Sequence, residues 1–271
     1  RSGHEDPGEA DGQRAGGAEH GGEATSAACS GSVLEPEPGA DRRQESSQGI
    51  VVDRRAHVPV AGSYEVKELG EVRDGRLLPE HRWLGQPDGT TRWYSAALSM
   101  GIAIESLSAS FAYEWSPLDR QGRPDVTIIE AVADLVNSAA YVGARMVHLP
   151  CLESPAPREM SDCRKIMEHF SPIFARAHER HIIVCLETYW PSDVARRLTQ
   201  FDPTVFQVSF DVGNCVALGR DPAIELDILG DSLGQLRLRD RRRHEIFRSL
   251  PLGHGDVDWS SVQQQVVRLS Q

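Results

Sequence analysis

The sequence predicts a parallel α/β barrel of the TIM (β/α)8 type that is incomplete. After Gly101, short apolar segments alternate five times with segments whose apolar residues recur at the helical period. Glu187, Asp211 and Asp240 each stand at the carboxyl end of a predicted strand, where a barrel gathers its site. A doubly wound nucleotide-binding sheet requires a glycine-rich turn, and neither GxGxxG nor a GxxxxGKS or GxxxxGKT motif occurs. The barrel is therefore favoured over the doubly wound sheet.

Each strand and helix has its own signal in the sequence. Residues 181–187 are almost continuously apolar, which is typical of a parallel strand covered on both faces. Pro124 and Asp125 mark a helix start, and Pro172 is expected to kink or split the following helix. The predicted strands are 102–110, 145–150, 181–187, 205–211 and 233–240. The predicted helices are 90–100, 125–144, 158–180, 192–200, 222–229 and 257–269.

The composition divides the chain into two regions. Residues 1–49 hold ten glycines, and their only members of the set Val, Ile, Leu, Met, Phe, Trp and Tyr are Val33 and Leu34. Such a segment cannot bury enough surface to offset its ordering entropy, so we expect a disordered, acidic tail. Four arginines against ten acidic residues give it −6 of the total charge of −11. The barrel domain is expected over residues 50–271, with its first strand weakly placed at 50–60.

Charge and cysteine content narrow the class of protein. A mildly acidic domain without a clustered basic face argues against nucleic-acid binding. The five cysteines are odd in number and form no CxxC pair, which favours a reducing compartment over a disulfide frame or a zinc ribbon. No apolar run reaches the ~20 residues of a membrane span, and the N-terminus lacks a signal-peptide core. We therefore expect a cytoplasmic protein with a small-molecule ligand and no nucleic-acid or membrane partner, and a homo-oligomer is left open.

Glu187 and Asp211 are the first candidates for metal-binding or catalytic residues. A carboxylate at the end of a buried strand is costly unless it meets a cation or hydrogen-bond donors. Two carboxylates on adjacent strand ends repel each other, and a divalent metal relieves that repulsion. The alternative is that each carboxylate caps the helix that follows it. The spacing alone leaves both interpretations open.

Four segments in sequence order resemble the xylose isomerase-like TIM-barrel superfamily of sugar phosphate isomerases and epimerases. They are LETYW (186–190), FDVGNCVALGRDP (210–222), LGDSLGQLRLRD (229–240) and PLGHGDVDW (251–259). The resemblance covers roughly residues 101–271. It implies an isomerase or epimerase of a sugar or sugar phosphate that acts through an enediolate with a divalent metal ion: Mn²⁺, Mg²⁺, Co²⁺ or Zn²⁺.

The resemblance implies a partial ligand set. Glu187 would be a metal ligand and a proton-transfer base, and Asp211 the second ligand. On the next strand the family pattern is roughly HxHLKD, and Gln235 and Arg237 stand at its two histidines while Arg239 stands at its lysine. A guanidinium keeps its proton and cannot ligate a metal, so Arg237 is expected either to pair with a carboxylate or to bind a substrate phosphate or carboxylate. Arg239 is a further candidate for substrate binding.

Three further positions have two interpretations each. Asn214 stands where many relatives have a substrate-contacting histidine, and it is either a substrate contact or a turn residue. His254 stands in a loop where glutamate is frequent in the family, and it is either a substrate contact or a solvated side chain. His148 invites comparison with the zinc histidines of the endonuclease IV branch, but that branch needs a histidine where Asn214 stands. His148 is therefore expected to be packed or hydrogen-bonded in its strand.

The predicted barrel lacks its last strand. The chain reaches Gln271 at the end of the helix that should precede an eighth strand and its glutamate ligand. Two-base proton transfer would then lack its second base. Two alternatives to an isomerase therefore stay open: a dehydratase-type lyase of the same superfamily and a non-catalytic barrel remnant.

Overall fold

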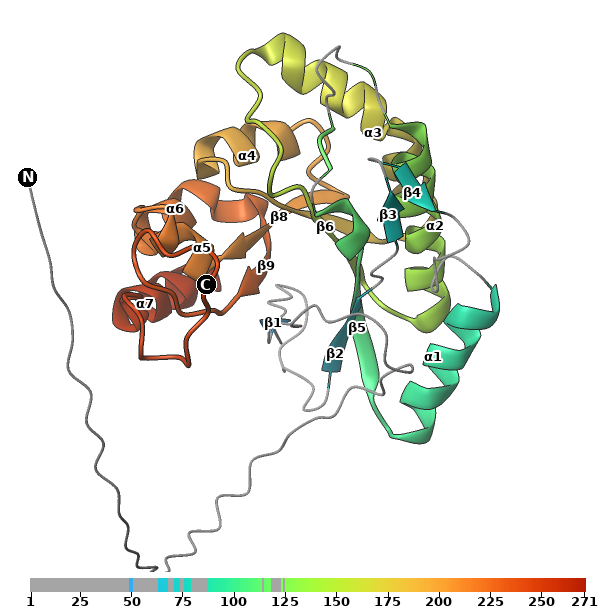
Figure 1. Ribbon diagram of the computed structural model, residues 1–271, viewed down its shortest axis with the longest axis horizontal. Coiled ribbons are helices and arrows are strands. Elements are labelled where there is room, and N and C mark those ends of the chain that lie inside the picture. The colour runs from blue at the N-terminus through green and yellow to red at the C-terminus, as the bar shows by residue number, and fades with distance from the viewer. Residues whose placement is uncertain are drawn as a thin grey trace, which may run out of the picture. The chain divides into compact units, whose positions relative to one another are not determined.

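The computed structural model describes residues 87–113, 115–117, 123 and 125–271, and the backbone of four strands that precede them (Figure 1). The predicted tail lies outside the described residues apart from Gly49, and so does the first-strand candidate apart from Ile50. No helix within the described ranges is long and apolar enough to cross a membrane.

A curved sheet forms the centre of the described structure (Figure 1). Its strands are hydrogen-bonded in the order β1-β9-β8-β7-β6-β5-β2, and those from β9 to β2 run parallel. The two-residue β1 pairs antiparallel with β9 at one edge. The strands are β1 Gly49–Ile50, β2 Ser63–Lys67, β5 Ala103–Ser108, β6 Met146–Pro150, β7 Ile183–Glu187, β8 Phe206–Asp211 and β9 Leu233–Arg237. The predicted incomplete barrel is confirmed as a half-barrel of five consecutive parallel strands, β5 to β9.

Helices alternate with the parallel strands and flank the outside of their curved row (Figure 1). They are α1 Pro87–Ser99, α2 Val126–Val142, α3 Met160–Arg180, α4 Ser192–Thr199, α5 Val212–Ala217, α6 Pro222–Leu229 and α7 Trp259–Leu269. Short 3-10 turns, η2 Ser110–Ala112 and η3 Gly230–Ser232, follow β5 and precede β9. A separate hairpin is formed by β3 Glu71–Arg73 and β4 Arg76–Leu78. The sequence did not predict α5, which is too short to show a helical period.

Helix α2 begins next to its predicted start, Asp125, and ends at Val142, two residues before the predicted end. The side chain of Asp125 accepts hydrogen bonds from the backbone N–H groups of Thr127 and Ile128, which satisfies donors that the first turn leaves free. Gly143 ends the helix at φ 77°, a left-handed conformation that costs glycine little. The predicted apolar face of this helix is buried.

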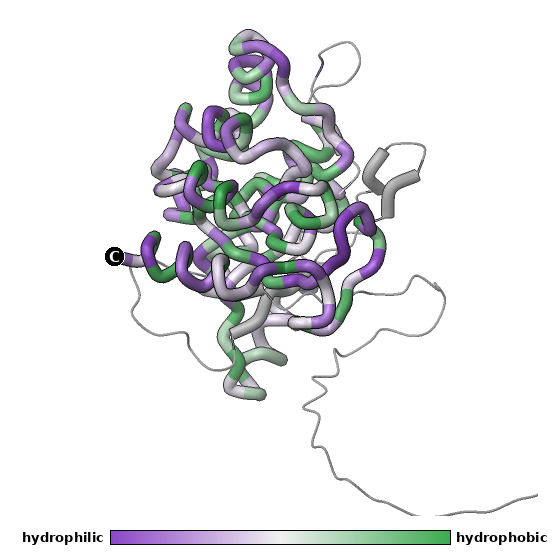
Figure 2. Tube along the Cα trace, turned by 90° about the vertical axis from the view of Figure 1, so that its left-hand side faces the viewer, coloured by the Kyte–Doolittle hydropathy of each residue, from purple (hydrophilic) through white to green (hydrophobic). Residues whose placement is uncertain are grey.

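Helix α3 contradicts one of the two alternatives expected for Pro172, a split helix. The helix runs unbroken from Met160 to Arg180 with Pro172 inside it, so it is not split. A proline removes one backbone hydrogen bond, whereas the neighbours Phe170 and Ile173 are fully buried in the core. Their packing holds the segment helical. Figure 2 shows hydrophilic and hydrophobic stretches alternating along such helices, as expected for elements with one buried face.

Two hydrophobic clusters support the strands. The first lies among β5–β7, α2 and α3 and includes the ring contacts of Phe170 with Trp115 and Phe206. The second joins β8 and β9 to α5, α6 and α7 and includes Leu226, Leu229 and Val262. Because both clusters pack against the strands, the side chains at the strand ends are held by a rigid frame.

Strand β9 is shorter than predicted. It ends at Arg237, whereas the prediction continued to residue 240. Asp240 instead forms an isolated bridge with Leu250 and accepts hydrogen bonds from the loop that follows. The carboxylate of Asp240 thus finds its hydrogen-bond donors in that loop, and the chain leaves the sheet after Arg237.

Candidate active site at the carboxyl ends of the strands

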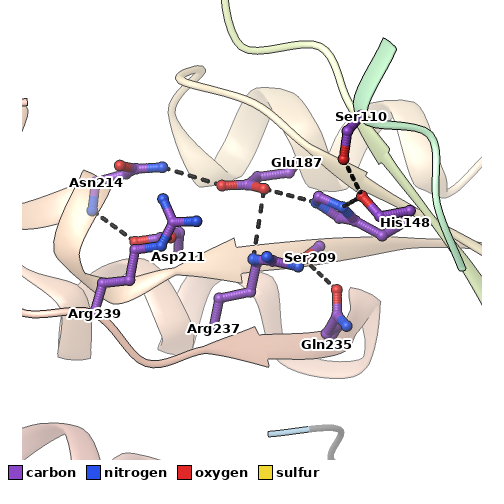
Figure 3. Close-up of polar contacts among 10 residues, drawn as sticks. Ser110, His148, Glu187, Ser209, Asp211, Asn214, Gln235, Arg237 and Arg239 are labelled. Atoms are coloured by element: carbon purple, nitrogen blue, oxygen red, sulfur yellow. Dashed lines mark hydrogen bonds and ion pairs between the residues drawn. The ribbon is translucent and has the colours of Figure 1, made fainter. Parts of the chain in front are cut away.

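Glu187 is the central residue of the site (Figure 3). It ends β7 and is 3 % exposed. Its Oε2 accepts a hydrogen bond from Nε2 of His148 at 2.6 Å and faces Nε of Arg237 at 3.7 Å. Its Oε1 accepts a hydrogen bond from Nδ2 of Asn214 at 3.0 Å. Burial opposes ionisation, but the His148 hydrogen bond and the Arg237 charge outweigh it and lower the pKa of Glu187 to about 2.

Asp211 ends the neighbouring strand β8 and serves two purposes. Its Oδ1 accepts the backbone N–H of Asn214 at 2.8 Å, which caps helix α5. Its Oδ2 lies 3.3 Å from Nε of Arg239. Burial raises the pKa of Asp211, and Arg239 offsets this only in part. Of the two alternatives that the sequence left open, a divalent metal and helix capping, the structure shows the cap at this carboxylate, together with an ion pair to Arg239.

Gln235 and Arg237 are two residues apart on β9, so their side chains lie on the same face of the sheet. In the parallel register of β8 and β9, Ser209 is opposite Gln235 and Asp211 is opposite Arg237. The hydroxyl of Ser209 donates to Oε1 of Gln235 at 2.7 Å, so the oxygen that a metal would need is engaged. Arg237 is 1 % exposed and pairs with Glu187, one of the two partners expected for it.

Gly213 lets Arg239 approach Asp211. A Cβ atom built on Gly213 would lie 2.8 Å from Cβ and 2.9 Å from the carbonyl oxygen of Arg239. Only glycine tolerates such close backbone packing without a shift. The segment after β9 therefore rests directly on the first turn of α5, and this contact carries the guanidinium of Arg239 to the carboxylate.

Sequence reasoning did not foresee the part that His148 takes in the site. His148 lies on β6 next to β7, and besides its bond to Glu187 its Nδ1 is 2.8 Å from Oγ of Ser108. Ser108 is in turn 3.1 Å from Oγ of Ser110 (Figure 3). The expectation of a hydrogen-bonded strand residue agrees with this geometry. The position of His148 near the end of its strand was the only signal in the sequence. Its partner, Glu187, is 39 residues away in the chain, so the contact itself could not be predicted.

Two tyrosines stand close to the charged group and were also missed. Tyr113 and Tyr189 lie close enough to influence each other's ionisation, and both interact with the charge of Glu187. Burial raises the pKa of both phenols, so they remain neutral donors near pH 7. The available signal for Tyr189 was its place in LETYW, two residues after Glu187.

His254 and Asp240 lie in a different environment. His254 is exposed in the loop between β9 and α7, and its backbone N–H bonds to Pro251. Asp240 accepts the N–H of Gly253 at 2.7 Å and Nε1 of Trp259 at 3.1 Å. Burial opposes ionisation of Asp240, but these and other loop donors lower its pKa. Asp240 thus organises the loop, and no polar contact between His254 and Glu187 or Asp211 is present in the described part of the chain.

The donor set does not fit the divalent metal that the resemblance implies. Both oxygens of Glu187 and Oδ1 of Asp211 accept hydrogen bonds. Oδ2 of Asp211 makes no hydrogen bond with the described residues, but it lies 3.3 Å from Nε of Arg239. Among the residues that the structure describes, no group of three or more His, Cys, Asp or Glu side chains could hold a metal ion. A metal would also meet two buried cations, and like unit charges about 4 Å apart near a protein surface repel by roughly 4 kcal/mol. The reaction proposed below therefore uses only the side chains of this protein.

Two buried amide atoms remain for a ligand or water. Within the described ranges, Oδ1 of Asn214 and Nε2 of Gln235 have no hydrogen-bond partner. A cavity of about 20 Å³ borders Asp211, Asn214 and Ser209, which is room for one water molecule. An unpaired buried amide group costs about 1–3 kcal/mol, so both atoms favour a polar partner such as a hydroxyl.

These observations define a parallel α/β half-barrel with a charged site at the carboxyl ends of its strands. The chain belongs to the xylose isomerase-like TIM barrel family, whose model matches residues 81–269. No curated protein matches it by sequence.

Solved structures share the fold at low sequence identity. A xylose isomerase domain protein from Planctomyces limnophilus is 13 % identical with a TM-score of 0.62, over 78 % of this chain and 77 % of that chain. A D-tagatose 3-epimerase-like protein is 16 % identical with a TM-score of 0.60, over 76 % and 78 %. An IolI protein with a bound zinc atom is 12 % identical with a TM-score of 0.55, over 76 % and 75 %. At these identities the likeness shows the fold, and the site must be judged on its own residues.

Proposed function

We propose that this protein is an isomerase or epimerase that binds a sugar or sugar phosphate at the Glu187–Asp211 site. The observation that carries the proposal is the position of Glu187: it is ionised, ends β7 beside Asp211, and is oriented by His148 and Asn214. Membership of the family and its neighbours named as isomerases and epimerases support the same class of reaction.

In the proposed reaction, a proton moves between adjacent carbons of the substrate. Glu187 accepts the proton from the carbon beside the carbonyl, which leaves an enediolate, and returns it to the former carbonyl carbon. The hydroxyl proton passes to the former carbonyl oxygen, so that the hydroxyl carbon becomes the new carbonyl. The negative charge that develops on the carbonyl oxygen needs a preorganised cation. Arg237 and Arg239 are the cations nearest the two carboxylates in the described residues. A carboxylate with a pKa of about 2 is a weak base, so this stabilisation must supply much of the rate.

A non-catalytic sugar-binding protein is the second candidate. It is favoured by the engagement of both oxygens of Glu187, because a base must release a partner before it can take a proton. In this case the two unpartnered amide atoms of Asn214 and Gln235 would hold substrate hydroxyls without reaction.

The test is incubation with a panel of ketoses, aldoses and their phosphates, followed by NMR for altered sugars. We expect conversion to an isomer or epimer, loss of that conversion in Glu187→Gln, and its retention in Glu168→Gln, an exposed glutamate on α3. Loss of water from the substrate would indicate the dehydratase reaction instead. Ligand-induced shifts without any conversion would identify the non-catalytic protein.

A further inference from the structure

We propose that Arg237 and Arg239 take the place of a divalent cation at the Glu187–Asp211 site, so that the protein works without a bound metal there. This inference goes beyond the proposed function, and it is tested on the protein alone. Its failure would leave the sugar-conversion experiment unaffected.

Three of the four carboxylate oxygens accept hydrogen bonds, and the fourth, Oδ2 of Asp211, makes none within the described ranges but lies against the guanidinium of Arg239. Oε2 of Glu187 is shared by His148 and Arg237, and its Oε1 is held by Asn214. Oδ1 of Asp211 caps α5 and its Oδ2 faces Arg239. A metal that approached Oε2 of Glu187 or Oδ2 of Asp211 would have to displace the guanidinium beside it (Figure 3).

The charges of the two carboxylates and the two guanidinium groups balance. Two buried carboxylates face two guanidinium groups that keep their protons at all ordinary pH values. The group is therefore neutral in total, apart from any charge on His148. A divalent ion would add two positive charges to a buried neutral group, and buried charges are tolerated only when they are paired.

The fold sets the backbone positions of both arginines. Arg237 is fixed opposite Asp211 by the register of β8 and β9, and its side chain is fully enclosed. Arg239 is held by the close contact between its backbone and Gly213. The backbone positions of both arginines are therefore fixed by the fold, and burial restrains the side chain of Arg237.

Calorimetric titration with Mn²⁺ and Co²⁺, together with thermal unfolding in their presence, tests the proposal. The purified protein, freed of metal with a chelator, should show no binding that depends on Glu187 and no rise in Tm with either ion. Glu187-dependent binding, present in the unaltered protein and lost in Glu187→Gln, would overturn the proposal.

Variants without the guanidinium charges test the converse, that a metal can bind once the arginines are removed. In Arg237→Gln/Arg239→Gln the two carboxylates lose their cations, and Mn²⁺ should raise the Tm of this variant while leaving that of the unaltered protein unchanged. Arg239→Gln alone is the second variant if the double variant does not fold, because Arg239 is the less buried of the two. No Mn²⁺-dependent rise in a folded variant would contradict the exchange of guanidinium for metal. Arg176→Gln, an exposed arginine on α3, is the matched control and should respond as the unaltered protein does.

Discussion

At the scale of single residues, the hydrogen bond between His148 and Glu187 orders the site. An ionised carboxylate only accepts hydrogen bonds, so Nε2 of His148 is the donor. If the imidazole is neutral, its Nδ1 is then an acceptor and the hydroxyl of Ser108 donates to it. The pair fixes the orientation of the carboxylate that we propose as the proton-transfer base.

Removing the imidazole should destabilise the protein. In His148→Ala the buried carboxylate of Glu187 loses its shortest hydrogen bond, and an unsatisfied buried group costs about 1–3 kcal/mol. The free energy of unfolding, measured with urea, should fall by that amount. His178→Ala is the control: its imidazole pairs with Asp202 at an exposed position, so a change within about 0.5 kcal/mol is expected. Equal effects of the two substitutions would refute a special role for the buried pair.

The lowered pKa of Glu187 predicts how stability depends on acid. Its folded pKa of about 2 lies below the ordinary 4.5, so the folded state gains stability above pH 4.5 and loses it as the pH falls toward 2. Asp211 acts in the opposite sense: its pKa is raised, so its contribution favours the folded state at low pH and is lost as the pH rises through the folded pKa.

Urea unfolding between pH 2.5 and 6 measures this dependence. The unaltered protein should lose stability more steeply below pH 4.5 than Glu187→Gln, in which the titrating group is gone. Parallel curves for the two proteins would show that Glu187 is not the group responsible.

Sequence reasoning placed Glu187 and Asp211 at strand ends because burial and strand periodicity fix where such residues stand. It could not choose the partner of Arg237, because both carboxylates lie within reach of one strand face. The contact of His148 was also out of reach, since it depends on which atoms of neighbouring strands approach each other. The roles given to Asn214, Arg239 and His254 as substrate contacts remain predictions.

At the scale of elements, the loop between β9 and α7 is fastened to Asp240. Its carboxylate accepts from the backbone of Gly253 and Val257 and from the indole of Trp259. The indole belongs to the first residue of α7. This single buried acid therefore connects the end of the sheet to the last helix.

Gly255 allows that loop to close on Asp240. A Cβ atom at this position would overlap Oδ1 of Asp240 and lie 2.6 Å from the carbonyl oxygen of Arg241. Gly255→Ala should therefore lower the free energy of unfolding by about 1–3 kcal/mol, the usual cost of overpacking. His254→Ala, at the exposed neighbour, should change it by less than about 0.5 kcal/mol. Denaturant titration of both variants checks this, and an unaffected Gly255→Ala protein would disprove the close packing.

Most elements could be predicted because each strand and helix has a clear apolar period, and helix α6 matches its predicted bounds, 222–229. The misses have local causes. Helix α5 has six residues, too few for a period. The split of α3 was wrong because tertiary packing around Phe170 and Ile173 overrides one missing hydrogen bond. The early end of β9 reflects side-chain bonding of Asp240, which no periodicity reveals.

At the scale of the whole molecule, parallel strands bring distant residues to one edge. His148, Glu187, Asp211 and Arg237 come from four successive strands of the half-barrel. The resemblance predicted the family correctly because four motifs occur in the right order with the right helices between them. It implied a metal because the two carboxylates match the family pattern, whereas the two arginines that face them change what this edge of the sheet can bind.

The most direct test of the account is deuterium incorporation at the carbon beside the carbonyl of a ketose phosphate, measured by NMR in D₂O with metal-free protein and excess chelator. Proton transfer by Glu187 without a metal predicts that deuterium enters the sugar, that the rate is unchanged by the chelator, and that Glu187→Gln abolishes it. Incorporation only after Mn²⁺ is restored, or at an equal rate in Glu187→Gln, would contradict the account.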